Sequence, residues 1–442
     1  MKFASLFLWL LILAGPAMAK VSEEEAAALG QTLTPMGAER AGNAKGDIPE
    51  WNGGYQGRPP CFRSGRYCDP FADDEPLYTI TAALAPEFGE KLSAGQRAML
   101  AKYPDSYKIP VYRSHRSFAN PPRIYEAVRK NALEAELAGY GETVLNARLG
   151  VPFPLPKDGL EAIWNHRLRY QGTGQKRWNN QVAVTASGSP TIVRIQEHVD
   201  FPYARETEQR GGIYRRLIQV VNAPEWLLGS AKLIHYSLDP RREAGGAWVT
   251  TPDTSFMRKA RSFGYDNPGI GSDGLRTADQ TDSFSGPSDR YIWRIVGKRE
   301  IAVPYNSYRI HDGGSIRELI RPGHLDLSRV RYEIHRVWVV DAFVKPGQIH
   351  QYKRRTFYLD EDSWQILLVD LYDARDELWR SQEVHTVMAY DQPLMMTAAD
   401  VVYDLKNGRY LVQGLSDEGD ETAFTEFEQG HFSSANVRGL AD

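Results

Sequence analysis

Residues that could do chemistry are present in this chain, but few stand at the spacings that chemistry requires. Residues 269–274 read G-x-G-x-x-G, a string that in dinucleotide-binding sites lies between a strand and a helix. Here Pro268 precedes it and a Thr/Asp-rich loop follows, so we interpret the match as chance. The sequence contains no G-x-S-x-G nucleophile elbow, H-E-x-x-H helix or P-loop. We therefore predict no catalytic residues, no cofactor and a protein that is not an enzyme.

The ten histidines and the acidic clusters also lack a catalytic or metal-binding pattern. His166 lies on a predicted helix, but no nucleophile or orienting partner stands at a recognisable spacing. His335 and His350 flank a predicted strand pair, and we interpret them as hydrogen-bonded structural residues. Asp360-Glu361-Asp362 and the aspartates of residues 253–289 depart from the calcium-loop spacing, so we expect solvated turn carboxylates and no metal site.

Tryptophan carries the positive signal for a binding site. The chain has 10 Trp and 23 Tyr, and many Trp lie in or beside predicted strands. Core packing explains most of them, but a curled sheet lined with such residues would also enclose a cavity for an apolar ligand. The residues that we predict as ligand-binding on this hypothesis are Trp164, Trp226, Trp293, Trp338 and Trp364.

The two cysteines, Cys61 and Cys68, lie in a Gly/Pro-rich loop. A zinc site would need two more ligands nearby, and a redox-active pair would usually read C-x-x-C. For an oxidising compartment we therefore predict that the pair forms a structural disulfide.

The N-terminus indicates export. Lys2 precedes an apolar run over residues 3–13, and a helix breaker and a small-residue site follow it. This pattern predicts a signal peptide, residues 1–19, cleaved between Ala19 and Lys20. The apolar run is too short to span a bilayer comfortably, so we expect a soluble periplasmic protein. The formal net charge of −3 removes a general electrostatic case for nucleic-acid binding.

Helix signals are a minority and concentrate in the first third of the chain. Capping boxes at Ser22 and Ser93 and a Pro pair at residues 121–122 predict helices within an irregular and helical N-terminal arm, residues 20–140, which also holds the predicted disulfide. A further helix is predicted over residues 158–170.

From Val182 onward the apolar residues alternate with period two, which predicts strands. An Asn407-Gly408 pair marks a hairpin turn. Strands joined in series by short loops predict an antiparallel sheet. The fold that we predict for residues 141–442 is β-rich (α+β), a large curled antiparallel sheet or incomplete β-barrel with helices in or over its concave face. Its longest loop, residues 251–289, is long enough to be functional.

Five longer strings resemble the motifs of a bacterial family known as domain of unknown function 1329. They are residues 150–170, 241–248, 271–286, 303–308 and 354–364. This family is distantly similar to the lipoprotein-sorting carriers LolA and LolB, which fold as an incomplete antiparallel barrel with helices as a lid over a hydrophobic cavity. The resemblance covers nearly the whole mature chain.

The resemblance implies a periplasmic carrier or chaperone that binds a lipid or another hydrophobic small molecule. Genes of this family often stand beside an RND-type exporter gene and an outer-membrane partner, so an inner-membrane RND-type exporter and an outer-membrane protein are the implied partners. The alternative is a non-enzymatic adaptor or assembly subunit of an envelope export complex. Such a subunit would bind protein partners and would have a filled interior with an exposed patch.

Overall fold

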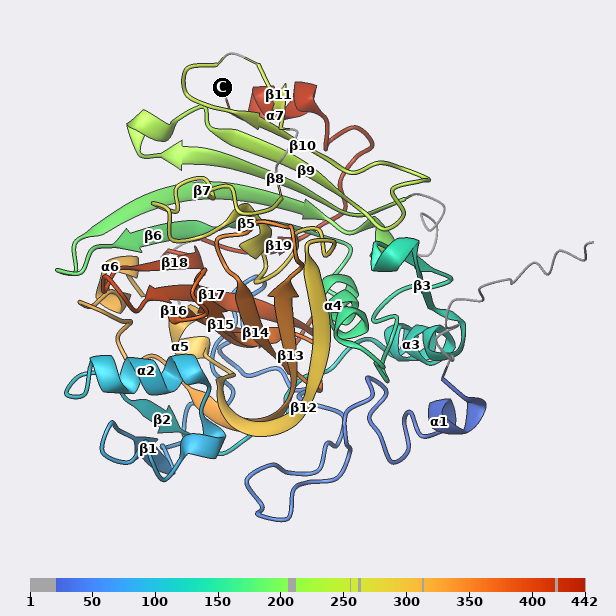
Figure 1. Ribbon diagram of the computed structural model, residues 1–442, viewed down its shortest axis with the longest axis vertical. Helices are drawn as coiled ribbons and strands as arrows, with labels where there is room; N and C mark the ends of the chain where they lie inside the picture. Colours follow the sequence, from blue (N-terminus) through green and yellow to red (C-terminus); the bar gives the residue numbers. More distant parts are fainter. Residues whose placement is uncertain are drawn as a thin grey trace, which may run out of the picture.

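One 17-stranded sheet runs through most of this protein, as the computed structural model shows (Figure 1). The structure describes residues 21–205, 212–254, 256–260, 264–311, 314–417 and 420–441. The predicted signal peptide and its cleavage site between Ala19 and Lys20 lie outside the described residues. Within the described part, no helix has the length and apolar character needed to cross a membrane.

The C-terminal half-sheet is a meander in which each strand pairs antiparallel with the next. Its strands are β12 (Tyr291–Pro304), β13 (Tyr332–Val344), β14 (Arg354–Asp360), β15 (Ile366–Tyr372), β16 (Leu378–Ala389), β17 (Leu394–Asp404) and β18 (Tyr410–Leu415). The predicted Asn407-Gly408 turn joins the last two, with Gly408 at φ 75° where a side chain would be strained. A bulge between Ile295 and Gly297 interrupts β12.

The N-terminal half-sheet continues from β18, which pairs antiparallel with β6. Its strands are β5 (Gly174–Trp178), β6 (Asn180–Val184), β7 (Pro190–Asp200), β8 (Ile213–Ala223), β9 (Ala231–Ser237), β10 (Gly246–Thr250) and β11 (Arg258–Lys259). The long β7 pairs with both β6 and β5, and β19 (Ala423–Phe424) pairs with β5. In the described residues, β12 and β11 pair on one side only, so the sheet curls without closing. This confirms the predicted large, curled, incompletely closed sheet.

The N-terminal arm packs onto this sheet. It contains α1 (Glu23–Ala27), α2 (Ala94–Lys102), α3 (Pro122–Glu134) and the strands β1 (Tyr78–Ile80) and β2 (Ile109–Val111). A separate hairpin of β3 (Glu136–Ala138) and β4 (Thr143–Leu145) connects the end of the arm to the residues that follow it. Both predicted capping boxes are present, at Ser22 and Ser93. The Cys61–Cys68 disulfide is confirmed. Val111 of β2 meets Tyr332 of β13 in the one parallel pairing of the described sheet.

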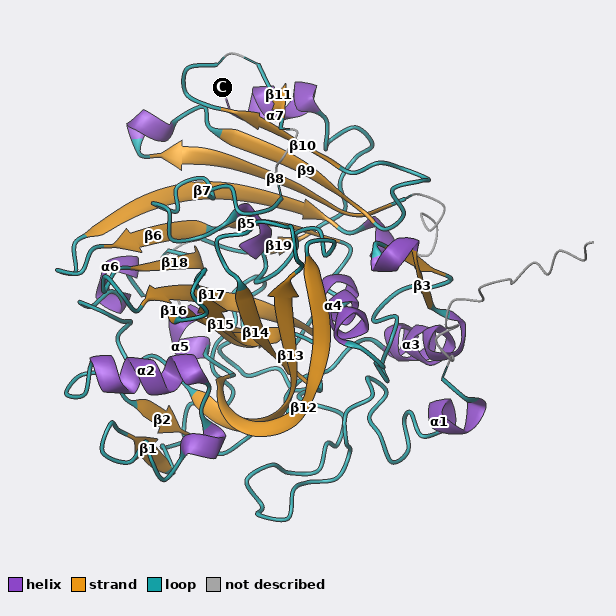
Figure 2. Cartoon of the chain, viewed as in Figure 1, coloured by secondary structure: helices purple, strands orange, loops and turns teal. Residues whose placement is uncertain are grey.

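The helix α4 (Gly159–Leu168) lies between the two half-sheets (Figure 2). Asp158 caps it by accepting from the backbone N–H of Leu160 and Glu161. A Cβ at Gly159 would lie 2.7 Å from the backbone nitrogen of Arg294, so glycine lets the helix begin directly against β12. All of its residues except Leu160 are buried, which is unusual for a helix and places it in the concave face as predicted.

The remaining helical segments are short, and the last of the 3₁₀ turns lies inside the protein with all of its residues buried. They are α5 (Tyr308–His311), α6 (Ile316–Leu319) and α7 (Ser434–Ala441), with the 3₁₀ turns η1 (Gly89–Lys91), η2 (Gly139–Gly141), η3 (Pro202–Ala204), η4 (Glu225–Leu227) and η5 (Ala278–Gln280). Val437 of α7 packs on Ile218 and Leu233, on the face of β8 and β9 that points away from α4.

The second part of the predicted long loop, residues 264–289, fills much of the space between the half-sheets. The prediction of solvated carboxylates is wrong here for Asp279 and Asp282. Asp279 is buried against Arg355 at 2.6 Å, and the carboxylate of Asp282 lies 2.6 Å from Arg169. These ion pairs hold a polar loop inside the protein because both carboxylates have a cationic partner.

Candidate binding cleft

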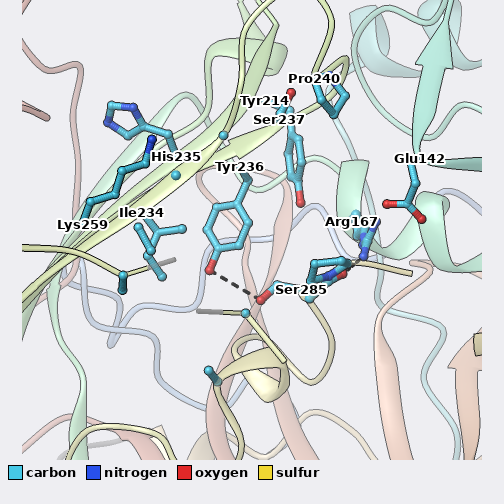
Figure 3. Close-up of a pocket in the computed structure, with 18 of the residues that line it drawn as sticks. Glu142, Arg167, Tyr214, Ile234, His235, Tyr236, Ser237, Pro240, Lys259 and Ser285 are labelled. Atoms are coloured by element: carbon cyan, nitrogen blue, oxygen red, sulfur yellow. Dashed lines mark hydrogen bonds between the residues drawn. The ribbon is translucent and has the colours of Figure 1, made fainter. Parts of the chain in front are cut away.

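A cleft of about 310 Å³ opens on the concave face of the N-terminal half-sheet (Figure 3). Strands β8, β9 and β10 form one wall, α4 forms a second, and residues 264–287 form the third. The lining side chains used below are Trp164, Arg167, Tyr214, Ile234, Tyr236, Ala247 and Ser285. This volume is at the lower end of the range for small-molecule pockets, about 300–1,000 Å³.

Strand register explains which residues face the cleft. Ile234 of β9 pairs with Leu217 on one side and with Ala247 on the other, so the three side chains share a face. The next residue, His235, points to the opposite face, where its Nε2 lies 3.0 Å from the carbonyl of Phe432. The alternation that predicted these strands therefore also divides them into a cleft face and a face covered by the C-terminal segment.

Aromatic rings form the inner end of the cleft. Trp164 and Tyr214 pack edge to face at 6.1 Å, and the ring of Tyr236 lies 5.9 Å from that of Tyr214. Trp164 Nε1 donates to the carbonyl of Gly141 at 2.8 Å, which satisfies its polar atom. Burial raises the pKa of Tyr214 to about 12, so its phenol is neutral at physiological pH. The rings therefore present uncharged, largely apolar surface to a ligand.

Arg167 adds a positive charge to this apolar wall. Its guanidinium lies 4.7 Å from the ring centroid of Trp164 and 5.2 Å from that of Phe284, and its Nη2 donates to the carbonyl of Gly286. Its Nε has no hydrogen-bond partner, and among the described residues no carboxylate lies within ion-pair distance. The cleft thus combines apolar walls with the Arg167 guanidinium, and Lys259 and Glu142 also line it. This arrangement suits an apolar molecule with a polar end.

Trp164 is the one predicted ligand-binding tryptophan that lines the cleft. Trp364 is fully buried in the C-terminal half-sheet, where its Nε1 donates to the carbonyl of Met36 at 2.9 Å. Trp338 stacks on Trp364 with ring centroids 6.2 Å apart. Both residues belong to the packing of that core cluster, and neither lines the cleft.

The other two tryptophans also lie elsewhere. Trp293 packs against Phe284 with centroids 5.1 Å apart, and its Nε1 donates to the carbonyl of Ser288. Trp226 is 67% exposed on the 3₁₀ turn after β8. The structure therefore does not bring the five tryptophans into one cavity. A ligand-binding role stays a prediction, and the cleft geometry supports it for Trp164.

Sequence reasoning missed Arg167, Tyr214 and Tyr236. Arg167 stands three residues after Trp164 on α4, a spacing that places two side chains on one face of a helix. That signal was present in the sequence. Tyr214 and Tyr236 could not be assigned to the cleft in the same way, because the inward face of a strand is defined only once its partners and register are known.

His166 does not have the surroundings of a general base. Its Nε2 lies 2.8 Å from the carbonyl of Asp282, and its Nδ1 accepts from the backbone N–H of Ile366 at 3.3 Å. Burial, with the nearby charge of Arg169, lowers the pKa of His166 to about 3. It is therefore a neutral, enclosed residue that ties α4 to the loop of residues 264–289 and to the C-terminal half-sheet.

One group of side chains has metal-like spacing. His335, Asp360 and Asp362 are buried, and one ligand atom from each lies within 4.8 Å of the others. Arg116 holds both oxygens of Asp362, at 2.7 and 2.8 Å. Burial opposes protonation of His335, but the carboxylates of Glu333 and Asp360 outweigh it and raise the pKa of His335. Cations of the protein thus already neutralise the cluster, which we interpret as an ion-pair network. The prediction that residues 360–362 are solvated is wrong.

Comparison with known proteins agrees with the sequence motifs. The model of a family described as "Protein of unknown function (DUF1329)" matches residues 79–438. An uncharacterised protein of Pseudomonas aeruginosa is 41% identical over 412 residues, which cover 92% of this chain and 90% of that protein.

Two solved structures are similar to this chain over part of its length. A domain of an outer membrane lipoprotein-sorting protein from Vibrio parahaemolyticus is 14% identical and covers 63% of this chain and 98% of its own, with a TM-score of 0.44. A LolA superfamily protein from Nitrosomonas europaea is 12% identical and covers 61% of this chain and 94% of its own, with a TM-score of 0.37.

Proposed function

This chain belongs to the DUF1329 family, and on that premise we propose that it is a periplasmic carrier or chaperone that binds a lipid chain or another small hydrophobic molecule. The observation that carries the proposal is the cleft on the concave face of an unclosed sheet, with Trp164, Tyr214 and Tyr236 as its inner wall. The predicted signal peptide and the family resemblance support the periplasmic location.

The size of the cleft limits the cargo. A volume of about 310 Å³ suits one small molecule or the end of one acyl chain. Each buried methylene contributes about 0.8 kcal/mol, so six to eight of them would retain a ligand with about 5–6 kcal/mol. Retention of this order is reversible, as a carrier that must release its cargo to a partner requires.

The partners that we propose are an inner-membrane RND-type exporter and an outer-membrane protein. The support for them is the family resemblance alone. Site-specific photocrosslinking from the exposed Trp226 position and from residues around the cleft, carried out in the native host, would identify proteins that contact each face.

A second candidate function is a non-enzymatic adaptor or assembly subunit of an envelope export complex. The filled interior favours it: α4 and residues 264–289 occupy most of the space that LolA-type carriers are expected to leave for lipid. This candidate predicts protein partners and no extractable ligand.

Ligand analysis separates the two candidates. Protein purified from its native host would be examined by native mass spectrometry and organic extraction, then titrated with the apolar fluorophore N-phenyl-1-naphthylamine. Ala247→Phe places a ring in the cleft and should weaken probe binding at least tenfold. Trp226→Ala, remote from the cleft, is the matched control and should leave binding unchanged. Empty protein that binds no probe would reject the carrier and leave the adaptor.

A further inference from the structure

A second compartment lies beside the cleft, at the junction of the two half-sheets. It has a volume of about 50 Å³ and a mainly polar lining, and we call it the polar chamber. Strands β5, β7 and β8 contribute one side, β17 and β18 the other, and residues 276–283 close it. Its charged lining residues are Arg169, Arg177, Arg215, Arg276, Glu197, Asp282 and Asp400.

The guanidinium of Arg276 has hydrogen-bond donors without an acceptor. The residue is 2% exposed, and the one hydrogen bond of its side chain among the described residues runs from Nη1 to the hydroxyl of Thr281 at 3.4 Å. Its Nε and Nη2 have no partner. Burial lowers the pKa of Arg276, because no counter-charge lies close enough to offset the loss of water. A buried guanidinium with free donors is costly unless an acceptor engages it.

The loop holds this guanidinium in place. The backbone N–H of Gly269 donates to the carbonyl of Arg276 at 3.0 Å, and the hydroxyl of Ser272 donates to the carbonyl of Gly269. A Cβ at position 269 would lie 2.9 Å from Arg276 Nη2. Glycine at the first position of the G-x-G-x-x-G string therefore has a role unrelated to dinucleotides: it leaves room for the guanidinium where it lies.

The carboxylates of the chamber are already engaged by other groups. Glu197 pairs with Arg177 at 2.7 Å, and Asp282 pairs with Arg169 at 2.6 Å. Asp400 accepts from the side-chain amides of Gln382 and Gln413 at 2.7 and 2.8 Å. Four arginines and three carboxylates give the chamber lining a formal charge of +1, and among the described residues Arg276 forms no ion pair.

The pKa of a neighbouring lysine reflects the same excess of positive charge. Lys232 of β9 pairs in register with Gln219, which lines the chamber. Burial and the charge of Arg276 lower the pKa of Lys232 to about 7. The electrostatic environment on this face of the sheet therefore favours an additional negative charge.

We propose that the polar chamber binds one oxyanion group, a phosphate or a carboxylate, with Arg276 as its principal donor. This inference goes beyond the carrier function and does not require it. A water needs about 10–15 Å³ of such volume, so 50 Å³ accommodates about three to five non-hydrogen atoms, the size of a carboxylate or phosphate group. The two adjacent donors of a guanidinium match two oxygens of such a group.

Two sources supply this chemistry, inorganic phosphate and the headgroup of a lipid whose chain occupies the cleft. The two compartments adjoin at Tyr236, which lines the cleft and lies 5.2 Å from the guanidinium of Arg215, a chamber residue. An anionic headgroup in the chamber and an apolar chain in the cleft would thus lie on either side of the Arg215–Tyr236 pair.

Calorimetric titration of the mature full-length protein with inorganic phosphate, at ionic strength matched with chloride, tests the proposal. We expect saturable binding that Arg276→Gln weakens at least tenfold. Gly269→Ala keeps the charge but pushes the guanidinium away, so it should weaken phosphate binding as well. The exposed Arg242→Gln is the control and should bind as the wild type does. These variants would be compared only where circular dichroism shows the native fold.

A second arm uses dihexanoyl phosphatidic acid. If Ala247→Phe weakens binding of this lipid but leaves phosphate binding unchanged, the chamber is a headgroup site. If Ala247→Phe leaves the binding of both ligands unchanged, the chamber is a site for a free anion. Either result supports the proposal. Absence of saturable binding of both ligands, or binding that Arg276→Gln leaves unchanged, would overturn it. Retained N-phenyl-1-naphthylamine binding in that case would show that the carrier function stands without it.

Discussion

The two half-sheets of this protein have the same antiparallel architecture but opposite interiors. On the C-terminal half-sheet, Trp364, Ile366 and Leu368 are almost completely buried beneath residues of α4 and the N-terminal arm. On the N-terminal half-sheet, the inward face meets residues 264–289, a loop rich in Gly, Ser and Asp. Small and polar side chains cannot fill the space above a sheet, so compartments remain there. What covers a sheet, more than the sheet itself, decides whether it forms a core or a binding site.

The largest effect on stability should come from removing a large side chain from the core of the C-terminal half-sheet. Trp364→Ala removes a fully buried indole and places alanine at φ 62°, so the free energy of unfolding should fall by about 3–5 kcal/mol. Urea denaturation measures it. Probe binding per folded molecule should not change, because Trp364 does not line the cleft. A selective loss of binding at unchanged stability would contradict the contrast between the halves.

Glu383 should make the C-terminal half-sheet sensitive to pH. It accepts from the hydroxyls of Tyr107 and Tyr332 at 2.9 and 2.8 Å, and burial raises its pKa from 4.5 to about 7. Between these values the folded state binds more protons than the unfolded state, so stability falls as pH rises, by up to about 3 kcal/mol.

Glu383→Gln should remove this part of the pH dependence. Denaturant midpoints measured from pH 5 to 8 would test it, with the exposed Glu426→Gln as control. A wild-type slope that Glu383→Gln retains would show that another group is responsible.

Lys232 should give the N-terminal half-sheet the opposite dependence. Its folded pKa of about 7 lies below its ordinary value of 10.5, so between these values the unfolded chain binds more protons. Stability should therefore rise with pH above 7, by about 2 kcal/mol up to pH 8.5. Lys232→Met should flatten that rise and stabilise the protein at neutral pH. Thermal melts of the wild type and Lys232→Met at pH 7.0 and 8.5 would test this pH dependence. An equal change of melting temperature in both proteins would show that Lys232 is not responsible.

The smallest effect should come from Trp226→Ala. This side chain is 67% exposed, so its loss should change the free energy of unfolding by no more than about 0.5 kcal/mol. Probe binding should also stay constant. A measurable loss of binding would place part of the site on the 3₁₀ turn after β8 and would restore Trp226 to the ligand-binding set.

Much of the fold was predictable because local signals agree with it. Capping boxes at Ser22 and Ser93, the Asn407-Gly408 turn and the period-two strands all act over a few residues. The interior was not predictable in the same way. Whether Asp279 and Asp282 are solvated depends on Arg355 and Arg169, which are remote in sequence, so local composition gave the wrong answer.

The site shows the same division. Trp164 was predicted from residue type, and α4 corresponds to the helix that was predicted over residues 158–170. The tryptophans that pack in the core have the same residue type, and only tertiary position separates them from Trp164. Arg276 carried no recognisable signal, because its importance comes from the partners that it does not have.

The bulge in β12 has a consequence for the behaviour of this protein at high concentration. An unclosed sheet exposes edge strands whose backbone groups could recruit a second molecule and start edge-to-edge aggregation. Along β12 the bulge before Gly297 breaks the regular ladder, and Arg294, Lys298 and Arg299 place cations beside it. Arg299 also donates to the carbonyl of Glu90, which ties the N-terminal arm to this edge. The protein can therefore keep its sheet open while its own irregularity discourages self-association along β12.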